Sequence, residues 1–258
     1  MSGISYDQDR ADKLVAAYVA PDMVRQRDAT LARLQPRPGE HILDIGSGPG
    51  FLCESIAAVV GPAGRVVGVD ISEDLIRFAV GHKSKGCIDY RLGDALALPF
   101  EEAAFDAAVS TQVIEYIADV DAALREMARV LRPGGRGFIV DTDFDSLVWH
   151  AADADRMAKI MKGWERHCAD PRLPRTLAPR LRAAGFSVTA VEAYPILNTR
   201  YDPEAFSQGL SRLIADFVVQ IGFDRHEVDD WLADLAETHR RGEYFFSINR
   251  YFFSVVKT

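Results

Sequence analysis

Short apolar runs alternate with stretches of helical spacing along this chain, which is the pattern of an α/β protein. The apolar residues Ile42, Leu43 and Ile45 suit a strand that is covered on both faces. Similar runs predict strands within residues 65–70, 89–92, 105–116, 138–142, 186–192 and 244–256. Helical spacing separates them, for example over residues 51–60 and 120–131.

A glycine-rich turn follows the first expected strand directly. The strand ends near Asp44, and Gly46, Gly48 and Gly50 come before a helical pattern that begins at Phe51. Glycines adopt backbone conformations that other residues avoid, and they let bare backbone approach a ligand. A strand, a glycine turn and a helix N-terminus in this order are typical of a ligand-binding turn.

The glycine spacing separates the families that use such turns. A dinucleotide fingerprint G-x-G-x-x-G starting at Gly46 needs glycine at position 51, where the chain has Phe51. No Gly-Lys-Ser or Gly-Lys-Thr follows to make a phosphate loop. The remaining pattern, D-x-G-x-G-x-G, resembles that of the class I S-adenosylmethionine-dependent methyltransferases. A nicotinamide oxidoreductase is disfavoured by Phe51.

Further motifs support the resemblance, because they follow one another along the chain at the spacing found in this family. Asp70 ends the second strand, residues 93–100 follow the third, and residues 105–116 hold the fourth strand and its exit loop. The resemblance implies that Asp70 accepts hydrogen bonds from the ribose hydroxyls of S-adenosylmethionine and that Ile71 packs on adenine. A single Asp after a strand is often only a helix cap or turn former, but three at successive strand ends lie where α/β sheets bind ligands. The implied cofactor site comprises Tyr18, Arg27, Asp44, Gly46, Ser47, Gly48, Gly50, Asp70, Ile71, Asp94, Ala95 and Gln112.

The resemblance also implies a fold. We expect a single α/β domain with a Rossmann-like, seven-stranded mixed sheet, helices on both faces and an antiparallel last strand. Residues 1–35 would form an N-terminal helical cap, with Pro21 in the first turn of a helix, and residues 36–196 would form the cofactor-binding core. Residues 197–240 would be a helical lid insertion, and residues 241–258 would supply the last strand.

The insertion carries two helical patterns. One is expected to start at Asp202 as N-cap with Pro203 in the first turn, and the other at Asp224 with Glu227 in capping-box position. Both have apolar faces. We interpret them as a lid over a substrate, and a homodimer interface is the alternative.

Composition and charge limit the partners. The 258 residues are 48% hydrophobic, which is enough for one full core, and the net charge is −8 with no run of Lys or Arg. A nucleic acid or an anionic membrane is therefore not expected as a partner. The polar start and the absence of a 20-residue apolar stretch predict a cytoplasmic protein. The three cysteines indicate reduced thiols rather than a disulfide frame, and no metal is expected.

Candidates for a general base follow the fifth strand. Asp143 and His150 are expected at the edge where the sheet opens toward a methyl acceptor. His167 shares a helical stripe with Met157, Ile160 and Trp164, so it is either a base in the pocket or a core histidine.

The most favoured function is methylation of a small organic acceptor at oxygen, nitrogen or carbon, with S-adenosylmethionine as cofactor. The overall resemblance is to the ubiquinone/menaquinone-biosynthesis-like branch. Two alternatives stay open. The first is a protein of the same fold that binds the cofactor without methylating, as a ligand-binding or rearrangement catalyst. The second is arsenite methylation, since Cys53 and Cys168 stand near two thiols of that family, although residues 193–258 contain no third cysteine.

Overall fold

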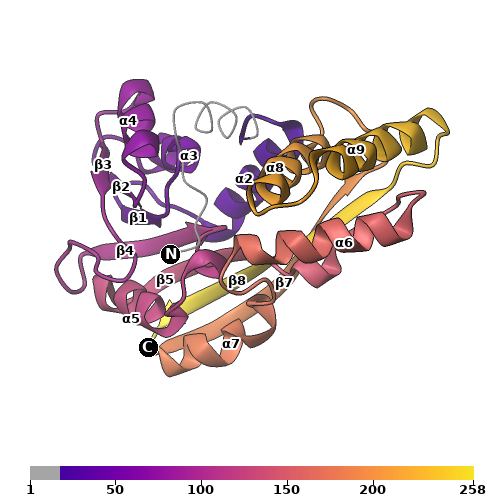
Figure 1. Cartoon of the computed structure of the whole chain (residues 1–258). Coiled ribbons are helices and arrows are strands. Elements are labelled where there is room, and N and C mark those ends of the chain that lie inside the picture. The colour runs from indigo at the N-terminus through magenta and orange to yellow at the C-terminus, as the bar shows by residue number, and fades with distance from the viewer. Residues whose placement is uncertain (1–17) are drawn as a thin grey trace.

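The chain forms one mixed sheet with helices on both faces. In this computed structural model, residues 18–258 are described. The sheet order is β3-β2-β1-β4-β5-β8-β6, with β7 paired to β8. The strands are β1 (His41–Ile45), β2 (Arg65–Asp70), β3 (Ile88–Leu92), β4 (Phe105–Thr111), β5 (Leu131–Thr142), β6 (Val148–Trp149), β7 (Phe186–Asn198) and β8 (Phe246–Lys257). Strands β1 to β5 are parallel, while β8 runs antiparallel to β5, β6 and β7 (Figure 1).

The predicted fold class is confirmed with one strand more than expected. The additional strand, β6, has only two residues, too few for an alternating pattern. Strand β7 also continues beyond its expected end at Glu192 to Asn198, because it pairs with β8 along its whole length. The helices are α2 (Pro21–Leu34), α3 (Phe51–Val60), α4 (Glu73–His82), α5 (Val120–Val130), α6 (Ala154–Trp164), α7 (Pro174–Ala183), α8 (Phe206–Gln220) and α9 (Arg225–Arg240).

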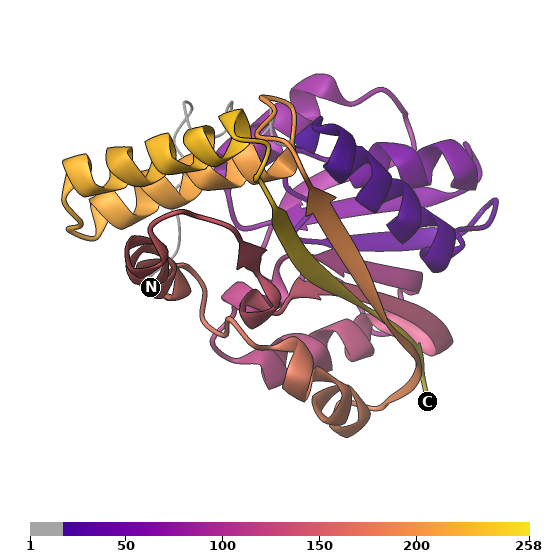
Figure 2. The same cartoon turned by 90° about the vertical axis from the view of Figure 1, so that its right-hand side faces the viewer.

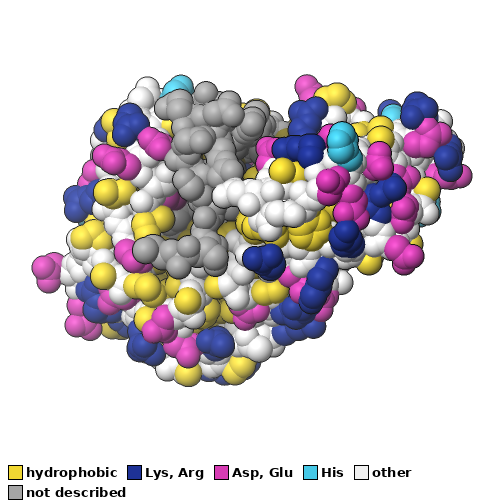
Figure 3. Space-filling model, in the orientation of Figure 1, with side chains coloured by type: hydrophobic (Ala, Val, Ile, Leu, Met, Phe, Trp, Pro, Cys, Tyr) yellow, Lys and Arg dark blue, Asp and Glu magenta, His cyan; other side chains and the backbone are white. Residues whose placement is uncertain are grey.

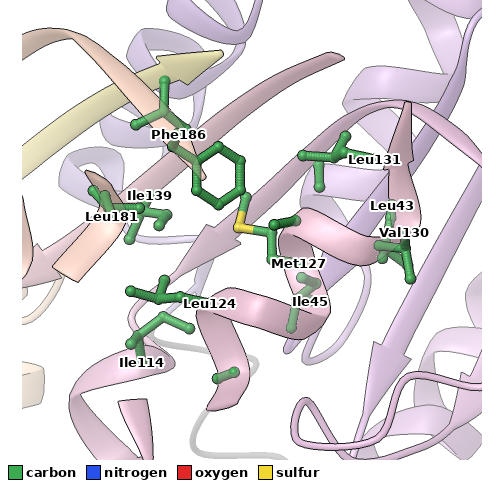
Figure 4. Packing of buried hydrophobic residues seen from close by; sticks show 14 of the residues in the cluster. Leu43, Ile45, Ile114, Leu124, Met127, Val130, Leu131, Ile139, Leu181 and Phe186 are labelled. Atoms are coloured by element: carbon green, nitrogen blue, oxygen red, sulfur yellow. The ribbon is translucent and has the colours of Figure 1, made fainter. Parts of the chain in front are cut away.

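Two hydrophobic clusters cover the two faces of the sheet. On one face, α5 and α7 contribute Leu124, Met127 and Leu181, which pack on Ile139 and Phe186 (Figure 4). On the other face, α2 and α3 bury Leu34, Ile56 and Val60 against strand residues such as Phe138 and Phe252. Because side chains alternate along a strand, β5 serves both clusters. The carboxyl ends of β1, β2 and β4 are thereby held in a fixed arrangement.

A third cluster extends the molecule to one side. Helices α6, α8 and α9 pack around the first part of β8, and Figure 2 shows α8 and α9 side by side as a long antiparallel pair. The fully buried residues Ile214, Val218, Trp231 and Phe246 belong to this cluster. The predicted helix pair therefore shares a core with the sheet.

The start of α8 differs from the prediction at Asp202 and Pro203. The helix begins at Phe206, whose backbone N–H donates to Asp22 Oδ2 on α2 at 3.0 Å. Asp202 instead closes a local turn by accepting from the backbone N–H of Glu204 at 2.9 Å. A carboxylate from a distant helix thus caps α8, and local sequence carries no sign of it. The starts at Pro21 and at Asp224, which accepts from the backbone N–H of Glu227, are confirmed.

Charges of both signs are mixed on the visible face of the molecule (Figure 3). No helix within residues 18–258 combines the length and the apolar character that a bilayer crossing demands.

Candidate functional site

The turn after β1 is closely packed and has the conformation that glycine permits. Gly46 and Gly50 have φ values of +73° and +85°. A Cβ on Gly46 would lie 2.1 Å from Val113 Cγ2, and one on Gly50 would lie 2.3 Å from the Tyr90 hydroxyl. Any side chain at these positions would clash, so the sequence needs glycine here for packing as well as for φ.

Asp70 ends β2 and faces this turn. Its Oδ2 accepts from the backbone N–H of Gly48 at 2.9 Å, and its Oδ1 accepts from that of Ser72 at 2.8 Å. Burial raises the pKa of this carboxyl, while the two backbone donors oppose the shift. Each carboxylate oxygen has further lone-pair capacity. The group is thus positioned by backbone and can accept two more hydrogen bonds from a diol such as ribose.

Apolar side chains stand exposed beside Asp70. Ile71 is 73% exposed, and Leu92 at the end of β3 is 56% exposed. Asp94 is exposed on the next loop and accepts from the backbone N–H of Leu96, while Ala95 is half-buried. These residues could hold the flat, apolar faces and polar edge of a nucleobase.

Tyr18 and Arg27 lie at the other side of the glycine turn. The Tyr18 ring stacks on Phe51 with centroids 6.2 Å apart, and its hydroxyl would lie 3.4 Å from a Cβ on Gly48. The Arg27 guanidinium lies 5.5 Å from the centroid of the Phe51 ring and donates to the Tyr18 carbonyl at 3.3 Å. A cation is therefore available beside the turn for an anionic group.

Asp44 is fully buried beneath the turn. Burial raises the pKa of its carboxyl to about 7, and its Oδ2 accepts from the Cys53 thiol at 3.3 Å. Burial also raises the pKa of Cys53, and it raises that of Cys168 to about 12. Arsenic binding requires thiolates, so both cysteines are poorly suited to it.

A chain of hydrogen bonds links Gln112 after β4 to the last strand. Gln112 has a φ of +58°, and its backbone N–H donates to the Val140 carbonyl at 2.7 Å. The Thr142 hydroxyl donates to Gln112 Oε1 at 2.8 Å and accepts from Arg250 Nη1 at 2.9 Å. Three side chains from β4, β5 and β8 are thereby aligned at one edge of the sheet.

Two buried carboxyl groups lie at the same edge. Glu115 and Asp141 are 0% exposed. Glu115 Oε2 accepts from the backbone N–H of Thr142 at 2.7 Å, and Asp141 Oδ1 accepts from that of Glu115 at 3.4 Å. Burial raises the pKa of Glu115 to about 7, and it raises the pKa of Asp141 well above the usual range. Neither residue is distinguished by the sequence pattern, since each follows an apolar run like an ordinary strand-end acid.

Several buried polar atoms near these strand ends have no hydrogen-bond partner within residues 18–258. Buried polar groups are almost always paired, so such a concentration indicates where a ligand or water completes the structure. The atoms are Ser47 Oγ, Ser110 Oγ, Thr111 Oγ1, Glu115 Oε1, Asp141 Oδ2 and Arg250 Nε.

The two predicted bases have different surroundings. Both carboxylate oxygens of Asp143 are held by Arg175, at 2.6 Å from Nε and 2.9 Å from Nη2. His150 is exposed after β6, whose Trp149 lies opposite Phe246. The last residue of β5, Thr142, lies opposite Arg250 of β8. Phe246 and Arg250 are four residues apart on β8, so the ends of β6 and β5 are separated by roughly 13 Å along that strand. The structure therefore does not bring His150 and Asp143 together.

His167 is a fully buried histidine in an aromatic group. Its ring stacks on Trp164 with centroids 3.6 Å apart, and Phe144 and Tyr116 meet it edge-on. Burial lowers its pKa to about 4, so the imidazole is neutral at pH 7. Nδ1 lies 2.6 Å from the Trp164 carbonyl and carries the proton, while Nε2 has no partner within the described residues.

Elsewhere, an open hollow of about 880 Å³ lies between α6 and α9. Its lining combines alanines with charged residues such as Asp153, Arg156, Asp230 and Glu237. It contains none of the strand-end residues described above. No group of three or more His, Cys, Asp or Glu within residues 18–258 could hold a metal ion.

Comparison with known proteins gives consistent matches. Residues 43–139 match the family model described as a methyltransferase domain. Demethylmenaquinone methyltransferase from Symbiobacterium thermophilum is 31% identical over 215 residues, which cover 71% of this chain and 86% of that protein. An uncharacterised 37.1 kDa protein in transposon Tn4556 of Streptomyces fradiae is 35% identical over 194 residues, which cover 72% of this chain but only 54% of that protein.

Solved structures share the fold at lower identity. Phosphoethanolamine N-methyltransferase 2 from Haemonchus contortus, in complex with S-adenosyl-L-methionine, has a TM-score of 0.66 and 21% identity, covering 98% of this chain and 58% of that chain. The [4+2]-cyclase SpnF has a TM-score of 0.57 and 22% identity, covering 90% of this chain and 80% of that chain.

Proposed function

The chain belongs to the class I S-adenosylmethionine-dependent methyltransferases, and we propose that it methylates a small hydroxylated aromatic acceptor. The observation that carries the cofactor part is Asp70, which two backbone donors aim at the glycine turn. When bound, S-adenosylmethionine supplies an electrophilic methyl group on a sulfonium. The exposed apolar side chain of Ile71 fits the adenine of this cofactor. The polar atoms of Ser47 fit the polar groups of its methionine part, and the cation of Arg27 fits its carboxylate.

The acceptor class is supported by the aromatic side chains near the exit of β4. His167 contacts Tyr116, Phe144 and Trp164 there, and of these rings Tyr116 is exposed and Phe144 is half-buried. Aromatic groups favour planar acceptors by stacking and edge contacts. The demethylmenaquinone methyltransferase that this chain resembles is named for a quinone, which is planar and gives a hydroxylated aromatic ring when it is reduced. Residues 197–240 would cover this acceptor as a lid, in a protein that we further propose to be cytoplasmic.

Methyl transfer from radiolabelled S-adenosylmethionine tests this function. We expect label in the organic extract with reduced naphthoquinones, catechols or phenols as acceptors, together with release of S-adenosylhomocysteine. The alternative of a non-methylating protein predicts tight cofactor binding without S-adenosylhomocysteine release for any acceptor. Tight NAD binding would contradict the proposal altogether.

Variants of His150 and Asp143 test whether the chain supplies a general base in addition to positioning the acceptor. Since His150 is exposed beyond the end of β5, we expect His150→Gln to lower turnover by less than about threefold. We expect Asp143→Asn to lower thermal stability, because it removes the charge that faces Arg175. A fall of about 10²–10⁴-fold in turnover, with cofactor affinity unchanged, would instead establish the predicted general base.

A further inference from the structure

Arg250 is an almost fully buried guanidinium that forms no direct ion pair with the carboxylates of residues 18–258. It is 6% exposed, and within residues 18–258 no carboxylate oxygen lies within 4.0 Å of its nitrogens. Its hydrogen bond to Thr142 Oγ1 and its position 5.3 Å above the Phe206 ring are neutral contacts. Its Nε has no hydrogen-bond partner in the part of the chain that the structure describes. A buried charge left uncompensated is costly, so an anion is expected to complete this site.

The two nearby carboxyl groups do not supply that anion. Glu115 and Asp141 make their hydrogen bonds to backbone N–H groups. Their charges act on Arg250 from beyond ion-pair distance, that of Glu115 more strongly than that of Asp141. Burial raises the pKa of both, which favours their neutral forms. Burial also lowers the pKa of Arg250, and the charge of Glu115 offsets that shift only in part.

The position of Arg250 in the sheet indicates which ligand it meets. Its Cα pairs with that of Thr142, the last residue of β5, so it lies at the carboxyl edge. Strands β4 and β5 separate β8 from β1, which places Arg250 roughly 14 Å from the glycine turn along the sheet. Arg27 already lies beside that turn. The hydrogen-bond chain through Thr142 to Gln112 links Arg250 to the loop after β4.

We infer that Arg250 is the recognition residue for an anionic oxygen, carboxylate or phenolate, of the methyl acceptor. This inference rests on the proposed function and adds a specificity-determining contact to it. A guanidinium presents a planar fork of donors that matches such oxygens. The Phe206 ring covers one face of the guanidinium, so an anionic oxygen would meet it in its plane, where Nε has no partner within the described residues.

Calorimetry with 2-naphthoate and its methyl ester, in the presence of S-adenosylhomocysteine, tests this site. We expect the wild-type protein to bind the carboxylate at least tenfold more tightly than the ester. Arg250→Met should weaken naphthoate binding by about 10- to 100-fold and leave the ester unaffected, while Arg250→Lys should be intermediate. The affinity for S-adenosylhomocysteine should stay within threefold in all variants.

Thermal unfolding separates recognition from a structural role. Removal of an unpaired buried charge should leave the Tm of Arg250→Met unchanged or higher. The matched control is Arg136→Met, whose guanidinium is paired with Glu40 at 2.7 and 2.9 Å on the opposite edge of the sheet. It should lower the Tm and keep the preference for naphthoate, since it leaves a carboxylate unpaired.

Several results would overturn the inference. They are equal binding of naphthoate to wild type and Arg250→Met, no wild-type binding of naphthoate below 10 mM, or a Tm loss in Arg250→Met as large as in Arg136→Met. A drop in S-adenosylhomocysteine affinity with the naphthoate preference intact would assign Arg250 to the carboxylate of the cofactor instead. Failure of the wild type to bind S-adenosylhomocysteine at all would contradict the proposed function and not this assignment alone.

Discussion

Asp70→Ala is expected to weaken binding of S-adenosylmethionine by about 30- to 1000-fold. The carboxylate would accept two charge-assisted hydrogen bonds from the ribose, and the loss of both should cost roughly 2–4 kcal/mol of binding free energy. The side chain also holds the backbone N–H groups of Gly48 and Ser72, so its loss loosens the turn on which the ligand rests. Isothermal titration with S-adenosylmethionine and with S-adenosylhomocysteine measures the effect.

Two further variants make this result specific. Asp70→Asn keeps one acceptor oxygen and should lose less affinity than Asp70→Ala. Asp89→Asn is the control, because Asp89 lies on the neighbouring strand and pairs with Arg65 and Arg91 away from the turn. It should bind the cofactor like the wild type. Equal affinity of Asp70→Ala and the wild type for S-adenosylmethionine would contradict the assignment of Asp70 to the ribose.

The cofactor end of the site could be predicted because its determinants are local in sequence. A strand end, a glycine turn and a helix start are encoded by about ten consecutive residues, from His41 to Gly50. Asp70 and Asp94 each follow their own strand in the same way. Hydrophobic periodicity then placed the three acids at one edge, since parallel strands end together.

The acceptor end could not be predicted because it is assembled from distant segments. Arg250 lies within a long aromatic strand, where its neighbours indicate only β structure. Its importance follows from burial without an ion pair, which exists only once β8 pairs with β5. His150 illustrates the converse, because β8 extends beyond β5 and moves β6 away from the edge that local sequence suggested.

The start of α8 shows a similar limit. Asp202 and Pro203 have the chemistry of a helix start, yet Asp22 provides the cap from α2. The same carboxylate accepts from the Asn198 side chain at 2.9 Å at the end of β7. The N-terminal helix, the last part of β7 and the helix pair are thus joined by one buried carboxylate, a contact that no local pattern encodes.

Trp231→Ala is expected to destabilise the protein by about 3–5 kcal/mol, a large fraction of the roughly 5–15 kcal/mol that stabilises an ordinary domain. Trp231 on α9 is fully buried, and its indole N–H donates to Met157 Sδ at 3.1 Å on α6. Its ring also meets Trp149 edge-on. The substitution leaves a cavity between both helices and β8, and urea unfolding measures its cost. Leu213→Ala on α8 is the control, because Leu213 is 40% exposed and should cost less than about 1 kcal/mol.

The same variant tests whether the helix pair acts as a lid. The hydrophobic cluster around Trp231 also contains residues of β8 and α6, so excision of residues 197–240 would expose the sheet itself. A single cavity at Trp231 disturbs the helix pair more selectively than such an excision. The glycine turn and Asp70 lie at the ends of β1 and β2, whose packing belongs to the other two clusters. Below its Tm, Trp231→Ala should therefore bind S-adenosylhomocysteine like the wild type and lose acceptor turnover. Full turnover combined with a change from dimer to monomer would assign α8 and α9 to a subunit interface, since an apolar face can cover either a substrate or a second copy of the chain.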